Sequence, residues 1–515
     1  MSSESNYSVE CHTCFSSKSR FSMVSIMLGM TVCFSTLWRF PYQVANFGGA
    51  GYILVYILMI SLFVFPALTA EWGLGRFTKR GPDGAYTQLK MPGGKLIAVI
   101  LFGVVLAVGS YFVIWIGWIL RYGISSLLDS NLVNPATNSN QYFDSQVASD
   151  PVLQLVFALI VLLLIAPTIL GGTKKIESLS KTIVPIFYLL VIGMTFLIII
   201  QPGVLTGTFN FLTSLDISTQ ITSFTFIAAL GQAFFSLCLG GTYMVLYASY
   251  TEKKHTHNIP GNALFTVIGN TLASLIAVVL VIGVVIMSGI VTTDGLASFG
   301  PGLFFGVIPE AFQAISLTLG GPISALLMAV FFIMFFFSAY LPMTAIITVT
   351  TTALERSFNI KRRSAFLIIL GSTLLLAIPS ALSPLDGGFL YNLDIFVGAI
   401  GSVIGSIIAM IAFAWFIDKK VALEEINIGS RIKLGNFYHF TIKYIAPMFM
   451  IFVVLYALAD VVLANVGLNA LQETDYFLYK SIIDISPILV AVILVFVAIL
   501  AIGQSLITKN RKTST

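Results

Sequence analysis

Long stretches of this chain contain no charged residue, and this feature constrains its fold more than any other. Residues 186–200 and 488–502 are examples, and only 10% of the 515 residues are charged. A soluble domain carries roughly 25% charged residues, so these stretches cannot form a water-facing surface. Each stretch with its flanks reaches the roughly 20 residues that a membrane-spanning helix needs. Lipid offers no partner for backbone polar groups, and the stretches do not alternate like barrel strands, so we expect spanning helices.

The basic residues orient these helices in the membrane. About twelve spans are expected, at 22–46, 50–76, 96–127, 151–171, 177–201, 222–249, 261–289, 321–355, 364–383, 391–418, 441–465 and 482–507. None of the 27 Lys and Arg residues falls in four alternate loops, at 128–150, 202–221, 290–320 and 384–390. Lys and Arg concentrate on the cytoplasmic side of membrane proteins. We therefore expect a multi-pass protein of the plasma membrane with both termini in the cytoplasm.

A few polar residues inside the spans are candidates for function, because charge in hydrocarbon is costly. Arg39 lies inside the first span, Glu71 near the inner end of the second and Asp394 near the outer end of the tenth. Arg39 and Asp394 can be interpreted as a static ion pair or as a gate that closes over a substrate. Residues 231–242 contain a Gln, several Gly and two hydroxyl residues in mid-span. This composition favours either an interrupted helix lining a cavity or a close helix-packing interface.

Several motifs, in order along the chain, resemble the neurotransmitter:sodium symporter family. They are LWRFPY at 37–42, NFGGA at 46–50, EWGLGR at 71–76, the segment 231–240, YASY at 247–250, EEIN at 424–427 and YIAP at 444–447. The resemblance covers nearly the whole chain. It implies an all-α membrane protein with the LeuT fold, which has twelve transmembrane helices, a 5+5 inverted repeat and discontinuous spans 1 and 6.

The resemblance also implies a domain organisation. A cytoplasmic tail at 1–21 precedes the first inverted repeat, spans 1–5, at 22–201. The second repeat, spans 6–10, covers 222–418, and the peripheral spans 11–12 cover 436–507. Residues 508–515 form a second cytoplasmic tail.

By the same resemblance, a first sodium site is expected around the break in span 1. Its ligands would be the carbonyl of Thr31 and the side chains of Thr36, Ser236 and Asn270. Thr36 stands where the family usually has Asn, so a hydroxyl replaces an amide oxygen. All four residues offer the oxygen ligands that sodium prefers.

A second sodium site implied by the resemblance is incomplete in this sequence. The carbonyls of Gly29, Val32 and Ser338 would contribute to it. Leu341 and Pro342 stand where the family has two hydroxyl residues, and neither offers a side-chain oxygen. Either Ser338 or Thr344, one helical turn away on each side, compensates for this loss, or the site is lost.

A chloride site is also implied, and its donors are present. They are Tyr56, Gln232, Ser236 and Ser274. Chloride-independent relatives carry a carboxylate at the position of Ser274, whereas this chain is neutral there. The alternative interpretation is that these polar residues make helix-packing hydrogen bonds.

The resemblance places a set of residues around the substrate: Thr31, Phe34, Ser35, Val108, Tyr111, Phe112, Phe235, Ser236, Cys238, Gly241 and Ile346. Phe112 aligns with a tyrosine that holds the substrate carboxylate, and a slip of one residue would place Tyr111 there. Gly241 replaces a bulky aromatic residue, so we expect an enlarged pocket for a large apolar or aromatic side chain. Cys33 stands where amine transporters carry Asp, which favours an amino acid over a monoamine.

The gates of the family are partly kept. Arg39 and Asp394 match the outer gate, and Tyr250 matches the inner-gate tyrosine. Arg356 replaces the acidic member of the inner gate, and its basic partner near residue 14 is missing.

The implied function is secondary active transport rather than enzyme catalysis. We expect sodium-coupled symport of a neutral, large apolar or aromatic amino acid, with Na+ and, as a further candidate, Cl− as co-ions. The alternative is a sodium-independent exchanger or a proton-coupled carrier of the same fold, in which Glu71 or Asp394 titrates. The expected partners are the small substrate and membrane lipid. Basic residues are spread between spans, which argues against nucleic acid, and the sequence does not set the oligomeric state.

Overall fold

The fold was described from a computed structural model of the chain. It describes residues 20–465, except 33, 48, 83, 214–220, 222, 252–257, 288–302 and 385–387. Within this part of the chain all regular secondary structure is helical. The predicted twelfth span, the C-terminal tail, most of the N-terminal tail, Cys33 and the side chain of Phe34 lie outside the described residues.

Nine helices in the described part are long and apolar enough to cross a membrane. They are Ala50–Thr78 (α4, η1 and α5), Gly94–Leu128 (α7), Pro151–Leu170 (α9), Gly172–Ile199 (α10), Ile259–Met287 (α15), Gly321–Phe358 (α18), Arg362–Leu382 (α19), Phe389–Phe416 (α20, η6 and α21) and Asn436–Leu455 (α23, η7 and the start of α24). Each overlaps a span predicted from the sequence. Three of them contain one π-helical turn, at Ile60–Val64 (η1), Asp394–Ile400 (η6) and Thr441–Ile445 (η7).

The first and sixth spans are interrupted, as predicted. Helix α1 (Arg20–Thr31) is followed by α2 (Phe34–Leu37) and α3 (Arg39–Asn46), and Ser35–Asn46 is bent by 69° from α1. Helix α13 (Ser223–Ser236) and α14 (Tyr243–Ser249) are separated by the non-helical residues 237–242. With these two broken spans, eleven of the twelve predicted spans have a counterpart among the described residues.

The unwound residues 237–242 are held by close backbone packing against α21 (Gly401–Phe416). Gly240 has a left-handed φ of 75°, and a Cβ atom there would lie 1.8 Å from the carbonyl oxygen of Ser402. A Cβ on Gly405 would lie 2.0 Å from the carbonyl oxygen of Gly240. The fully buried Glu71 of α5 (Phe65–Thr78) accepts a 2.8 Å hydrogen bond from the Gly240 N–H and another from the Ser406 hydroxyl. Backbone contact and a buried carboxylate therefore fix this break.

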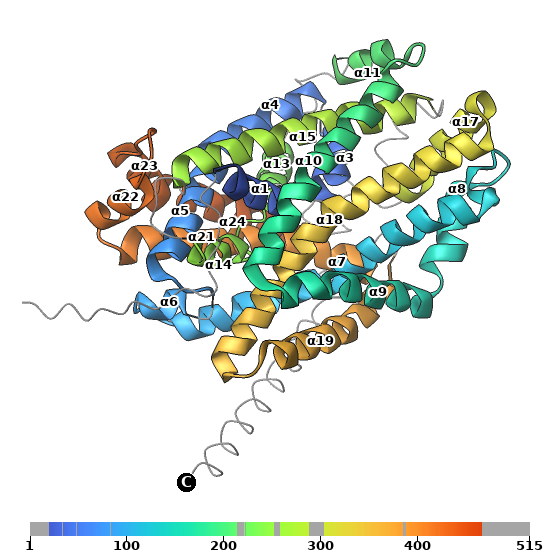
Figure 1. Ribbon diagram of the computed structural model, residues 1–515. Coiled ribbons are helices and arrows are strands. Elements are labelled where there is room, and N and C mark those ends of the chain that lie inside the picture. The colour runs from blue at the N-terminus through green and yellow to red at the C-terminus, as the bar shows by residue number, and fades with distance from the viewer. Residues whose placement is uncertain are drawn as a thin grey trace, which may run out of the picture.

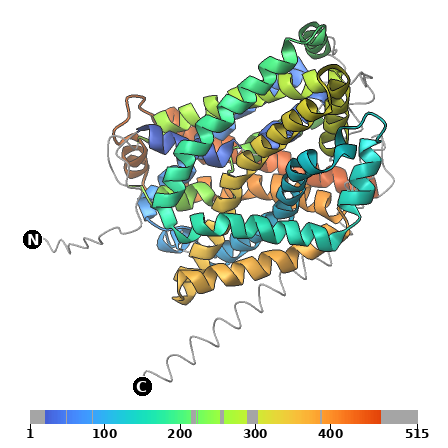
Figure 2. The ribbon, with the colours of Figure 1, turned by 45° about the vertical axis from the view of Figure 1, so that its right-hand side comes forward.

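The interrupted spans lie inside the bundle of long helices. Helix α18 contacts α1, α7, α10 and α14, and α21 contacts α5 and α13. Figures 1 and 2 both show α18 running beside α10 through the bundle. Figure 1 shows α9 and α19 together at one edge of the molecule. The breaks in spans 1 and 6 thus lie where side chains from several helices converge.

Shorter helices connect the spans at the surface. They are α6 (Ala85–Gln88), η2 (Ser130–Val133), α8 (Ser139–Tyr142), η3 (Phe143–Ala148), α11 (Val204–Thr213), η5 (Leu303–Val307), α17 (Ile308–Leu319) and α22 (Lys419–Asn427). Helix α17 lies in the loop expected at 290–320. Its Gln313 donates hydrogen bonds to the carbonyl of Leu132 and the hydroxyl of Ser139, at 3.2 and 2.9 Å. These bonds join α17 to the polar loop at 128–150.

Candidate functional site

A cluster of buried oxygen atoms lies at the break in span 1. The Thr36 hydroxyl donates to Asn270 Oδ1 at 3.3 Å and lies 3.4 Å from the carbonyl oxygen of Thr31. Asn270 Nδ2 in turn donates to Ser236 Oγ at 3.2 Å. These four residues are fully buried. The structure therefore brings together all four residues predicted for the first sodium site, and their oxygen atoms suit a hard cation.

The residues predicted for chloride border this oxygen cluster. Tyr56 Oη lies 3.2 Å from Ser236 Oγ, and Asn270 Nδ2 donates to Tyr56 Oη at 3.5 Å. Ser274 Oγ donates at 2.9 Å to the Asn270 carbonyl, within α15. These hydroxyls are neutral donors of the kind an anion requires.

Gln232 completes the set of candidate anion donors. Its Nε2 donates to the carbonyl of Ser35 at 3.2 Å. Its Oε1 is buried without a hydrogen-bond partner among the described residues. The four predicted residues thus contribute three hydroxyls and one carboxamide, which are donor types that suit an anion.

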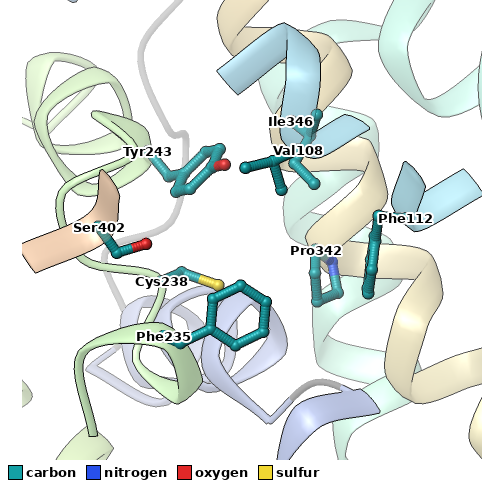
Figure 3. A pocket seen from close by; sticks show the side chains of 8 residues that line it. All are labelled: Val108, Phe112, Phe235, Cys238, Tyr243, Pro342, Ile346 and Ser402. Carbon is teal, nitrogen blue, oxygen red and sulfur yellow. The ribbon is translucent and has the colours of Figure 1, made fainter. Parts of the chain in front are cut away.

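A small, mainly apolar cavity of about 30 Å³ lies between the broken sixth span and α7, α18 and α21 (Figure 3). Its lining residues are Val108, Phe112, Phe235, Cys238, Tyr243, Pro342, Ile346 and Ser402. Five of them were predicted as substrate residues, whereas Tyr243 and Ser402 were missed and Pro342 was expected at the second sodium site. Among the other predicted residues, Thr31, Ser35 and Ser236 belong to the ion cluster and its border.

The expected enlargement of this cavity at Gly241 does not arise. A Cβ atom on Gly241 would lie 1.9 Å from Cε2 of the Tyr243 ring. The ring of Tyr243 therefore folds back over Gly241 and takes the space of the missing side chain. In Figure 3 the Tyr243 ring, the Cys238 sulfur and the Ser402 hydroxyl all point into the cavity. In the sequence, the large side chain of Tyr243 close after Gly241 was the signal that this space could be filled.

The neighbouring residues Tyr111 and Phe112 of α7 have different surroundings. Phe112 lines the cavity. Tyr111 instead donates its hydroxyl to Asp394 Oδ1 at 2.9 Å. In this structure the cavity wall therefore has the phenyl ring of Phe112, and the Tyr111 hydroxyl is bound to Asp394.

Arg39 and Asp394 form the expected ion pair. Arg39 Nη1 lies 3.3 Å from Asp394 Oδ2, and both side chains are largely buried. The Arg39 guanidinium lies over the ring of Phe235, 5.3 Å from its centroid. Because Phe235 also lines the cavity, the ion pair and the Tyr111 hydroxyl cover one side of it.

A second ion pair, which the sequence did not predict, lies near the predicted inner-gate residue Tyr250. Glu355 pairs with Arg362 at 3.0 Å, and Arg362 also donates to the hydroxyl of Thr352 at 3.4 Å. Thr352 lies 3.4 Å from the hydroxyl of Tyr250, and the Arg356 guanidinium lies 5.9 Å from the centre of the Tyr250 ring. An ion pair is therefore present next to Arg356, formed by its neighbour Glu355.

At the second predicted sodium site, the two hydroxyls considered as replacements bond within their own helix. The hydroxyl of Ser338 donates to the carbonyl of Phe335 at 2.7 Å, and that of Thr344 donates to the carbonyl of Tyr340 at 2.8 Å. The side chain of Leu341 lies against Gly29. The side chain that the structure places against Gly29 from α18 is thus that of Leu341.

These features define a multi-pass helical membrane protein whose two interrupted spans meet at a buried polar site, which is the architecture of a membrane transporter. The sequence profile of the sodium:neurotransmitter symporter family matches residues 13–151 and 144–506. The chain belongs to this family. Membership makes it a sodium-dependent transporter with the LeuT fold and not an enzyme.

Individual relatives agree with this assignment. An uncharacterised sodium-dependent transporter of Methanocaldococcus jannaschii is 27% identical over 498 residues, which cover 92% of this chain and 96% of the relative. The sodium-dependent dopamine transporter of Bos taurus is 25% identical over 486 residues, 84% of this chain and 67% of the relative. The crystal structure of MhsT in complex with L-phenylalanine superposes with a TM-score of 0.76 at 26% identity, covering 86% of this chain and 99% of MhsT.

Proposed function

We propose that this protein is a sodium-coupled symporter of a neutral amino acid with an apolar side chain. The buried oxygen cluster of Thr31, Thr36, Ser236 and Asn270 carries this proposal. Ser236 lies between the cavity residues Phe235 and Cys238, and Cys238 Sγ donates to the carbonyl of Met30 at 3.0 Å. Cation ligands and cavity wall are thus neighbouring residues of the same two broken spans. A bound cation there would lie beside the bound substrate.

The chemistry of the cavity wall supports the proposed substrate class. None of the described residues that line it is charged, and its polar groups are the hydroxyls of Tyr243 and Ser402 and the thiol of Cys238. Burying an apolar side chain in such a cavity favours binding, whereas burying an unpaired charge there opposes it. A zwitterion suits the site because its carboxylate can be balanced by the cation. The likeness to MhsT, whose structure holds L-phenylalanine, supports an aromatic or large apolar substrate.

Uptake into proteoliposomes tests the function. The purified protein is reconstituted, and labelled neutral amino acids are offered one at a time, with sodium replaced by potassium and chloride by gluconate in turn. We expect accumulation of an apolar amino acid only with an inward sodium gradient. Uptake that is unchanged in potassium would instead support the sodium-independent exchanger or the proton-coupled carrier.

We further propose plasma-membrane localisation with both termini cytoplasmic, and spans 1–5 and 6–10 as inverted repeats. The distribution of Lys and Arg between alternate loops supports the orientation. Arg39, Asp394 and Tyr111 would act as the outer gate, and Tyr250, with the Glu355–Arg362 pair, as the inner gate. Each set includes an ion pair between two helices, and such a pair can form in one conformation and separate in the other.

The proposed anion site has no negative charge of its own, so transport is expected to need a chloride ion there. Substituting Ser274→Glu would place a fixed negative charge one helical turn from Asn270, whose side chain contacts Tyr56 and Ser236. We expect uptake by this variant to be indifferent to replacement of chloride by gluconate. The matched variant Ser274→Gln, which is similar in size but neutral, should remain chloride-dependent. Wild-type uptake that already ignores chloride would contradict the anion site.

The size of the accepted substrate depends on Tyr243. Tyr243→Ala removes the ring that covers Gly241 and should enlarge the cavity by roughly the volume of that ring. Leucine then loses apolar contact, and we expect its affinity to fall about tenfold or more, while tryptophan binds better than before. Tyr243→Phe, the control, removes only the hydroxyl and should keep the wild-type preference. An unchanged ratio of tryptophan to leucine affinity in Tyr243→Ala would show that this ring does not limit the substrate.

A further inference from the structure

Hydrocarbon fills the space between α1 and α18 where a second cation would be expected. A Cβ atom on Gly29 would lie only 2.6 Å from Cδ1 of Leu341 and 3.3 Å from Cγ2 of Val184. The isobutyl group of Leu341 therefore lies directly against the backbone of α1. Leu341 is itself 3% exposed, so its side chain has no solvent-filled space to turn into.

This contact belongs to an apolar cluster distinct from the main core. Ile183 and Val184 of α10 and Leu341 of α18 form its buried centre. Partly buried neighbours pack around them: Leu28, Leu179, Tyr188, Phe337 and Tyr340. Three helices thus close this region with aliphatic and aromatic groups. A cation placed there would lose its hydration and find no side-chain oxygen at Leu341 or Pro342, which is unfavourable.

The polar groups that remain nearby do not replace the missing ligands. The hydroxyls of Ser338 and Thr344 bond to carbonyls of their own helix. Ser180 Oγ, 3.4 Å from the β position of Gly29, is a single hydroxyl from α10. Pro342 has no N–H and leaves the carbonyl of Ser338 without its usual helical donor, so this backbone oxygen is the one ligand that the substitution spares on this side of α18. Hard cations bind through several oxygen ligands at once, and the side chain that Leu341 presents to Gly29 is hydrocarbon and offers none.

We infer that this transporter couples the uptake of each substrate molecule to a single sodium ion. That ion binds at Thr31, Thr36, Ser236 and Asn270, and the contact of Leu341 with Gly29 permanently replaces a second ion between α1 and α18. This inference rests on the proposed function, because it counts the ions that drive the proposed symport. It also gives the apolar cluster a role, since the packing of α1 on α18 then needs no cation.

The coupling ratio can be measured as the substrate gradient that balances a known sodium gradient. Proteoliposomes holding the wild-type protein are given equal chloride and equal potassium on both sides, with valinomycin to hold the membrane potential at zero. Labelled substrate then accumulates until net flux stops. A sodium gradient of about tenfold supports about tenfold accumulation with one ion and about a hundredfold with two, because the free energies of the ion gradients add.

The outcomes separate this inference from the proposed function. About tenfold accumulation supports one sodium ion, and about a hundredfold overturns the inference while leaving sodium-coupled symport intact. No accumulation under any sodium gradient overturns the proposed function itself. As a second measurement, the sodium dependence of substrate binding to purified protein should have a Hill coefficient near one, and the matched variant Leu341→Ile should keep it. A coefficient near two in the wild type would overturn the inference.

Discussion

Replacing Asn270 with alanine is expected to raise the sodium concentration for half-maximal substrate binding by about 10- to 100-fold. Asn270 Oδ1 is the side-chain oxygen of α15 in the buried cluster, and its Nδ2 also positions Ser236 and Tyr56. The loss of a hydrogen bond or ligand to a charged group costs about 1.5–3 kcal/mol, which is roughly one to two powers of ten in affinity. Substrate binding to purified protein, titrated with sodium at constant ionic strength, measures this change.

The neighbouring Asn262 provides the control for this experiment. It is also a buried asparagine of α15, but its Oδ1 accepts from Arg20 at 3.3 Å and makes no contact with the oxygen cluster in the hydrogen bonds described. Asn262→Ala should leave the sodium concentration for half-maximal binding near the wild-type value. If Asn270→Ala also left it unchanged, the cation would have to bind elsewhere.

Gly240→Ala is expected to abolish transport and lower the stability of the folded protein. The added methyl group would lie 1.8 Å from the carbonyl oxygen of Ser402, and the left-handed φ of 75° is unfavourable for alanine. A left-handed non-glycine residue and overpacking together cost about 2–5 kcal/mol. The strain would separate residues 237–242 from α21 and displace Cys238 from the cavity. Thermal unfolding in detergent and uptake by reconstituted protein measure the two effects.

The matched control is Gly371→Ala in the middle of α19. A Cβ there meets no heavy atom within 4 Å, and alanine is the better helix former. This variant should unfold at or slightly above the wild-type temperature and should transport normally. A Gly240→Ala protein with wild-type unfolding and uptake would mean that the unwound segment does not pack on α21 during transport.

The helices of the fold could be predicted from the sequence because their signal is long and strong. Each span is a block of apolar residues. Because lipid cannot hydrogen-bond to the backbone, a spanning segment of this kind must be a helix that pairs its own N–H and C=O groups. The breaks were also predictable, since the glycines and polar residues of 231–242 weaken a helix in mid-span. The composition of that segment fitted helix packing equally well, and the resemblance of several motifs to one family decided between the two interpretations.

The packing of side chains at the site was less predictable. Residues 237–242 are not helical, so no period fixes the direction of their side chains or of Tyr243 after them. The identity of Gly241 indicated empty space, but the sequence could not show that Tyr243 would fill it. Likewise, the absence of hydroxyls at Leu341 and Pro342 was visible, whereas the contact of Leu341 with Gly29 depends on how α1 and α18 approach each other.

The buried Glu71 illustrates a residue whose role depends on its tertiary neighbours. Its position inside a span marked it as a candidate for proton transfer. In the structure one carboxylate oxygen accepts from the Gly240 N–H and the Ser406 hydroxyl. These contacts join α5, the unwound part of span 6 and α21. Partners that lie 169 and 335 residues away along the chain cannot be read from the local sequence.

The central claim is that the two broken spans hold a sodium ion beside an apolar amino acid. Its most direct test is equilibrium binding of labelled L-phenylalanine and L-leucine to the purified protein, in sodium chloride and in potassium chloride of equal concentration. The account predicts saturable binding of at least one of them in sodium and its loss in potassium. Equal binding in both salts would contradict it, since the oxygen cluster would then have no part in holding the substrate.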